Sequence, residues 1–81
     1  MIICGEASNG DELIEKLKTA SYDLVILDIS MPGKDTIDLL KEIQAGWEGL
    51  PVVILSMNPD EIYAVRMIRN GASAYINKET N

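Results

Sequence analysis

Four short apolar runs alternate with three longer segments along this chain, and this alternation limits the possible folds more than any other feature. The runs, at residues 1–4, 23–27, 51–55 and 74–76, are rich in Ile and Val and are bounded by turn-forming residues, as β-strands are. In the segments between them, apolar residues recur every three or four positions, as on one face of a helix. The sequence therefore predicts an α/β fold of order βαβαβαβ, with a parallel sheet because a helix lies in each crossover.

The predicted helices carry residues that are typical of helix ends. Residues 9–12 and 58–61 resemble capping boxes, and Asp35 is placed to cap the middle helix. Gly46 and Gly71 stand where helices often end in the left-handed conformation. The apolar faces of the helices are expected at Leu13, Ile14, Leu17 and Ala20, at Ile37, Leu40, Ile43 and Trp47, and at Ala64, Val65, Ile68 and Ala72.

Length and charge restrict the class of protein. Residues 1–81 are expected to form one small domain without repeats or linkers. The net charge of -6 argues against a dominant surface for nucleic acid or for an anionic membrane. The single cysteine, Cys4, cannot form an internal disulfide and is most simply a buried core residue. Because no signal peptide and no long apolar stretch is found, we expect a cytoplasmic, reduced protein.

Three polar residues lie at or just beyond the carboxyl ends of predicted strands. Asp28 ends the second strand, Ser56 ends the third, and Lys78 lies two residues beyond the last. In an open parallel sheet, ligands bind at this edge, and neighbouring strand ends are about 4.8 Å apart. A carboxylate, a hydroxyl and an ammonium group in one pocket suit phosphoryl transfer to the acid. The spacing therefore predicts a phosphoryl-transfer site.

Each of these residues also has a simpler interpretation. Asp28 alone is as readily a turn or capping acid, and Ser56 alone is more often a turn hydroxyl. Lys78 alone is typical of a solvated surface lysine. The coincidence of three such placements favours the common site.

Three segments of the chain resemble a known family. They read LVILDISMPGKDTIDLL, PVVILSMNPDEIYAVRMIRNGASAYINK and GEASNGDELIEKL. These segments resemble the receiver domain of two-component response regulators, above all the receivers that precede a helix-turn-helix output domain in bacterial transcription regulators. The resemblance covers nearly the whole chain and implies a flavodoxin-like open parallel sheet.

The resemblance also implies roles for single residues. Asp28 matches the phospho-acceptor, which takes a phosphoryl group from a histidine kinase with Mg²⁺ bound. Ser56 matches the hydroxyl that contacts this group on activation, and Lys78 matches the lysine that pairs with it. Tyr75 matches the aromatic switch residue, although a tyrosine on a short edge strand often only covers the core. The metal ligands implied are Asp28 and the backbone carbonyl of Ser30, and Pro32 and Gly33 match the turn that follows.

The chain departs from the family pattern in two ways. Thr36 stands where the family usually has glycine. The chain also begins at the family's second strand and stops just after its last, so we expect it to lack the first strand with its acidic pair, the first helix and the last helix. The missing strand would lie between the first two strands present here. Since Mg²⁺ needs several oxygen ligands, we expect weak metal binding and poor phosphorylation.

The predicted sheet has one face that the predicted helices do not cover. Right-handed crossovers between strands laid down in one direction put every helix on the same side. The runs LVIL and VVIL are apolar at every position, which indicates burial on both faces. We therefore expect two or more copies to bury the uncovered face against each other, with a two-fold homodimer as the default.

These observations predict a phospho-accepting signalling receiver, in fragment form, rather than an enzyme. A receiver fragment that associates with itself and no longer signals is the main alternative. A phosphatase of the haloacid dehalogenase type is a remote one, because such enzymes need a second acid two residues after the nucleophile, where this chain has Ser30. We expect a histidine kinase as partner, and no direct contact with nucleic acid or membrane.

Overall fold

The predicted strands pair side by side in one parallel sheet, in the order in which they occur in the sequence. The computed structural model describes residues 1–6, 9–29, 34–57 and 61–78, without the side chain of Lys34. This order of elements confirms the predicted βαβαβαβ pattern. The elements are β1 (Ile2–Glu6), α1 (Gly10–Thr19), β2 (Leu24–Ile29), α2 (Lys34–Gly46), β3 (Val52–Ser56), α3 (Glu61–Arg69) and β4 (Ala74–Asn77).

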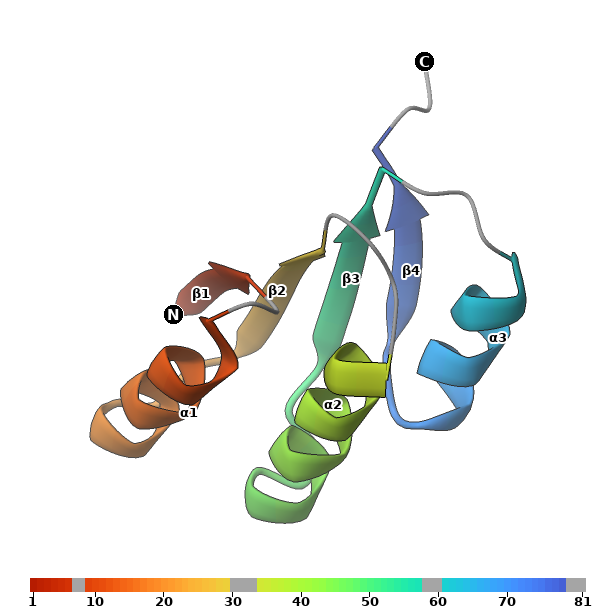
Figure 1. Cartoon of the computed structure of the whole chain (residues 1–81). Helices are drawn as coiled ribbons and strands as arrows, with labels where there is room; N and C mark the ends of the chain where they lie inside the picture. The colour runs from red at the N-terminus through yellow and green to blue at the C-terminus, as the bar shows by residue number, and fades with distance from the viewer. Residues whose placement is uncertain (7–8, 30–33, 58–60, 79–81) are drawn as a thin grey trace.

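Each strand pairs with the strand that follows it in the sequence. Figure 1 shows that α1, α2 and α3 consequently lie on the same side of the sheet, as right-handed crossovers in one direction require. The first two strands pair directly, from Ile2 opposite Leu24 to Glu6 opposite Asp28. The resemblance places another strand between these two, but in this structure β1 and β2 are direct neighbours.

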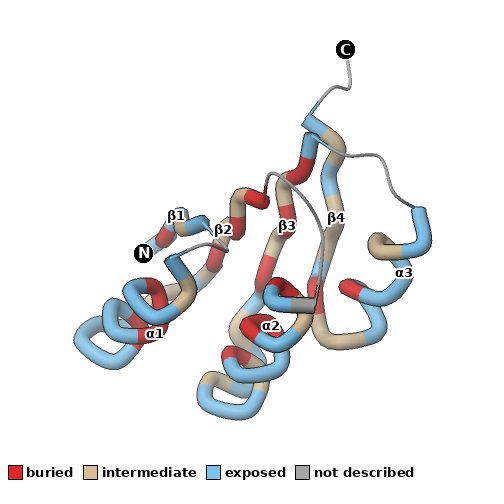
Figure 2. Tube along the Cα trace, in the orientation of Figure 1, coloured by how far each residue is buried: buried red, intermediate tan, exposed pale blue. Residues whose placement is uncertain are grey.

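The core lies between the helices and one face of the sheet (Figure 2). Burial alternates along β2 and β3 because successive side chains of a strand point to opposite faces. Val25, Leu27 and Ile54 are fully buried on the helix side. They belong to one cluster with Leu13, Ile14 and Leu17 of α1, Leu39, Leu40 and Ile43 of α2, and Met67 of α3.

The opposite face of the sheet, called the open face below, is covered by none of the described helices. Along β2 and β3 its side chains are only half-buried. At its margins it is more exposed, since Ile2 is 59% and Ile76 47% accessible to solvent. The uncovered face predicted from the sequence is thus present. Its apolar side chains are those of Ile2, Cys4, Leu24, Ile26, Val53, Leu55, Ala74 and Ile76.

Cys4 belongs to this open face, so the prediction that it lies in the core is wrong. In β1 the buried residue is Ile3, and its neighbours on either side point away from the helices. The apolar run alone does not reveal which alternate set of side chains faces the core.

Several predicted helix ends also differ from the structure. Asn9 occupies the N-cap position of α1, but its side chain makes no capping hydrogen bond within the described residues. Asp35 lies inside the first turn of α2 rather than before it, where its charge favours the helix N-terminus. Gly46 is the last residue of α2, and among the described residues the glycines with a positive φ are Gly49 and Gly71. Of the second predicted capping box, only its last residue is described. None of the described helices is long and apolar enough to cross a lipid bilayer.

Candidate functional site

An ion pair between Asp28 and Lys78 lies at the carboxyl edge of the sheet. The Nζ atom of Lys78 donates a hydrogen bond to Oδ2 of Asp28 at 2.6 Å. The two residues are 50 positions apart in the sequence, and the strand β3 lies between their strands. The side chains are 33% and 44% exposed for Lys78 and Asp28, so the pair is open to solvent and to small molecules.

The pairing of the strands explains how these side chains meet. Asp28 is the second-to-last residue of β2, and its register partner on β3 is Leu55, which in turn is paired with Ile76 of β4. The backbone N–H of Lys78 donates to the carbonyl of Ser56 at 2.8 Å and so continues the ladder beyond β4. Lys78 therefore points to the same face as Ile76 and Asp28, and its long side chain crosses β3.

Ser56 lies on the other side of the sheet. It is the last residue of β3 and is fully buried, on the same face as Val52 and Ile54. Since Asp28 is paired with Leu55, alternation directs Ser56 toward the helices and Asp28 toward the open face. The structure thus brings Asp28 and Lys78 together, whereas alternation directs Ser56 to the opposite face of the sheet. The common pocket of all three residues stays a prediction.

Tyr75 lies on β4, opposite Ile54, and is half-buried against the core cluster. It also lines a shallow groove with Ala64, Val65 and Ile68 of α3. This position agrees with the simpler interpretation, in which the ring covers the core. The role as a switch residue stays a prediction.

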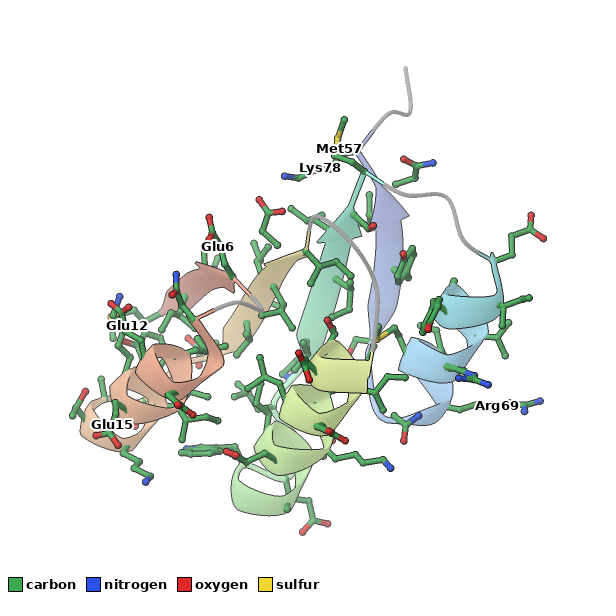
Figure 3. All side chains as sticks on the ribbon, viewed as in Figure 1. Glu6, Glu12, Glu15, Met57, Arg69 and Lys78 are labelled. Carbon is green, nitrogen blue, oxygen red and sulfur yellow. The ribbon has the colours of Figure 1, made fainter. Side chains whose placement is uncertain are left out.

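Glu6 is the residue at this edge that the sequence analysis did not identify. It is exposed at the end of β1 and is the register partner of Asp28, so the two carboxylates share the open face. Figure 3 shows Glu6 and Lys78 at the same end of the sheet. No motif marks Glu6, since its relation to Asp28 depends on β1 pairing directly with β2.

The described residues do not by themselves fit a magnesium site. Within the described parts of the chain, no group of three or more His, Cys, Asp or Glu side chains is placed to hold a metal ion. The Asp28 carboxylate is engaged by Lys78. The second predicted ligand, the backbone carbonyl of Ser30, lies outside the described residues, as do Pro32 and Gly33.

Comparisons with known proteins agree with the fold. A family model described as the response regulator receiver domain matches residues 1–81. The Fimbriae Z protein of Salmonella typhimurium is 45% identical over 65 residues, which are 80% of this chain and 31% of that protein. The probable C4-dicarboxylate response regulator DctR of Bacillus subtilis is 40% identical over 76 residues, 94% of this chain and 34% of that protein. The chain thus spans about a third of the length of these relatives.

Solved structures share the fold. The receiver domain of NtrX from Brucella abortus superposes with a TM-score of 0.83 at 26% identity, covering 100% of this chain and 88% of that one. A two-component response regulator from Clostridium difficile gives a TM-score of 0.83 at 20% identity, covering 99% of this chain and 84% of that one, which bears on the fold alone.

Proposed function

Because this chain belongs to the family of response regulator receiver domains, we propose that it accepts a phosphoryl group on Asp28. Receiver domains are signalling modules of two-component systems, and histidine kinases phosphorylate them. The observation that supports Asp28 as the acceptor is its 2.6 Å pair with Lys78 at the carboxyl edge of the sheet. A histidine kinase is accordingly the proposed partner. We also propose a cytoplasmic location, as the sequence predicts.

The proposed reaction uses the Asp28 carboxylate as a nucleophile. One of its oxygens attacks phosphorus, a new O–P bond forms, and the bond from phosphorus to the donor breaks with its electron pair on the leaving group. The product is an acyl phosphate on Asp28. Lys78 keeps the attacking carboxylate in place and then faces the phosphoryl oxygens, whose negative charge its ammonium group balances.

Ser56 and Tyr75 enter this proposal as residues that respond to the phosphoryl group. Ser56 is buried on the helix side, so a contact with a group on Asp28 requires a local rearrangement at the end of β3. Such a rearrangement is a two-state change that the added charge biases. Movement of Tyr75 against α3 would accompany it, since Tyr75 lies opposite Ile54 on the neighbouring strand.

Receiver domains generally bind Mg²⁺ at an acidic pocket. For this chain we propose weak binding, because Asp28 and the carbonyl of Ser30 are too few ligands for an ion that prefers six oxygens. Isothermal titration calorimetry with Mg²⁺ tests this, with Ca²⁺ as the comparison. Saturation at low micromolar Mg²⁺ would contradict the proposal.

The experiment that tests the phospho-acceptor is incubation with acetyl phosphate and Mg²⁺, followed by intact-mass measurement. We expect the wild type to gain the mass of one phosphoryl group and Asp28→Asn to gain none. Asp38→Asn is the matched control, because Asp38 is an exposed acid of α2 and its loss changes the net charge equally. An equal gain in wild type and Asp28→Asn, or no gain in the wild type, would refute the assignment.

A second candidate function, self-association without signalling, is favoured by the open face. If each of its apolar side chains offers about 50 Å² of surface, two copies bury about 800 Å² in total, below the roughly 1,200 Å² at which stable specific interfaces begin and in the range of weak, transient ones. We therefore propose a homodimer with a dissociation constant of about micromolar or weaker. Light scattering at rising protein concentration measures it. A phosphatase of the haloacid dehalogenase type has less support, because Ser30 stands at the position of its second acid.

A further inference from the structure

The Lys78 side chain spans the full width of β3 to reach Asp28. In the register, Asp28 and Ile76 are both level with Leu55, and Lys78 lies two residues beyond Ile76. With strands about 4.8 Å apart and about 3.3 Å between successive residues of a strand, the Cα atoms of Asp28 and Lys78 are roughly 12 Å apart. The 2.6 Å hydrogen bond between their side chains therefore requires a lysine side chain that is almost fully extended.

The Lys78 side chain is also well covered for a lysine that follows an outer strand. It is 33% exposed, less than the shorter side chain of Asp28 at 44%. A lysine that reached freely into solvent would be more exposed. Groups on the sheet therefore cover its methylene chain, while its ammonium group lies at the Asp28 carboxylate.

Leu55 and Met57 are placed on either side of the path of this methylene chain. Met57 directly follows Ser56, and Lys78 directly follows Asn77, the register partner of Ser56. The N–H of Lys78 donates to the carbonyl of Ser56 at 2.8 Å, which keeps the two chain segments together there, and Figure 3 shows Met57 and Lys78 at the same edge. Alternation along β3 places Leu55 on the open face and directs Met57 to it as well. The diagonal path from Lys78 across β3 thus runs between them.

We infer that Leu55 and Met57 form an apolar slot on β3 that holds the Lys78 side chain extended toward Asp28. A free lysine side chain samples many rotamers, and packing of its methylene groups between two apolar side chains favours the extended one. The unbranched thioether of Met57 suits this contact. The inference rests on the proposed phosphorylation of Asp28 and adds two positioning residues, which act through Lys78 and do not touch the reacting atoms.

The first test compares rates of phosphorylation by acetyl phosphate, followed by intact mass. Met57→Ala should lower the rate about three- to fivefold, because Lys78 is then less often in place. Met57→Leu keeps an apolar side chain of similar size and should stay within about twofold of the wild type. Ile62→Ala is the matched control, since Ile62 is an exposed apolar residue of α3. An unchanged rate in Met57→Ala, or an equal loss in Ile62→Ala, would overturn the inference.

A double variant shows whether Met57 acts through Lys78. In the Lys78→Met background no ammonium group is left to position, so a further Met57→Ala change should alter the rate by less than about 1.5-fold. The same comparison applies to Leu55→Ala, which is expected to slow the reaction only when Lys78 is present. A loss in the Lys78→Met background as large as in the wild type would mean that the slot does not position the lysine.

A third measurement needs no phosphorylation. In the slot, the side-chain protons of Met57 lie beside the methylene protons of Lys78, so nuclear Overhauser effects should join them in the unphosphorylated wild type. The Met57→Leu variant identifies the Met57 signals among the four methionines. If the wild type gains no phosphoryl group, the proposed function fails, and the Overhauser effects still judge the slot. If the wild type is phosphorylated but these effects are absent, only the slot is refuted.

Discussion

Replacing Gly71 with alanine tests the turn that leads from α3 into β4 and thus toward Lys78. Gly71 has a φ of 111°, a conformation that residues with a Cβ atom rarely adopt. Its neighbours close the turn by hydrogen bonds, since the N–H of Ala72 donates to the carbonyl of Met67 at 2.9 Å. An added Cβ would also lie 2.5 Å from Cγ of Gln44. Both the backbone conformation and the contact with Gln44 should therefore destabilise the Gly71→Ala variant.

The expected cost follows from these two contributions. A residue forced into such a backbone conformation costs about 1–3 kcal/mol. Displacing Gln44 from its rotamer costs about 0.5–1.5 kcal/mol, because its side chain is flexible enough to turn aside. We therefore expect Gly71→Ala to lower the free energy of unfolding by about 2–4 kcal/mol, a large part of the stability of a small domain.

Urea unfolding followed by the fluorescence of Trp47, the only tryptophan, measures this change. Two other glycines serve as matched controls. Gly49 also has a positive φ, of 86°, but no described atom lies within 4 Å of its added Cβ, so Gly49→Ala should show the backbone strain alone. Gly46 is helical and equally open, so Gly46→Ala should stabilise by about 0.5 kcal/mol.

The double variant Gly71→Ala/Gln44→Ala separates the contact from the strain. It should recover about 1 kcal/mol relative to the sum of the single changes, because the crowded side chain is gone. The reasoning would be refuted if Gly71→Ala cost no more than Gly49→Ala, or if it stabilised the protein.

The remaining predictions concern the site and the two faces of the sheet. Lys78→Met should lower the rate of Asp28 phosphorylation by acetyl phosphate more than tenfold. It should change the unfolding free energy by less than about 1 kcal/mol, because the Asp28–Lys78 pair is partly exposed. A large loss of stability at an unchanged phosphorylation rate would contradict this. Leu27→Ala, on the helix side of the sheet, should lower the free energy of unfolding in urea by about 2–5 kcal/mol. Leu55→Ala, on the open face, should lower it by much less. Similar losses for the two variants would mean that both faces of the sheet are equally buried in solution.

Much of the fold was predictable because it depends on local patterns. Runs rich in Ile and Val and the helical period between them identify the elements, and helix-containing crossovers imply a parallel sheet. The continuous apolar character of LVIL and VVIL, together with helices on one side, also predicted the open face. These inferences need only the composition and period of short segments.

The site was less predictable because it depends on strand ends. The second and third strands extend beyond their predicted last residues, to Ile29 and Ser56. Asp28 and Ser56 therefore lie within paired strands, where alternation sends Asp28 to the open face and Ser56 to the core. Because side chains alternate with a period of two, a difference of one residue in register reverses the face.

By itself, the sequence of this protein determined the order of its strands and helices, the parallel sheet and the residue types gathered at its carboxyl edge. Only the tertiary structure decided that β1 pairs directly with β2, that Glu6 thereby joins Asp28, and that Lys78 reaches Asp28 across β3. The physical reason is the separation along the sequence of the residues on which each feature depends. Local patterns depend on residues a few positions apart, whereas pairing and register depend on strands that are distant in the chain and meet only in the folded sheet.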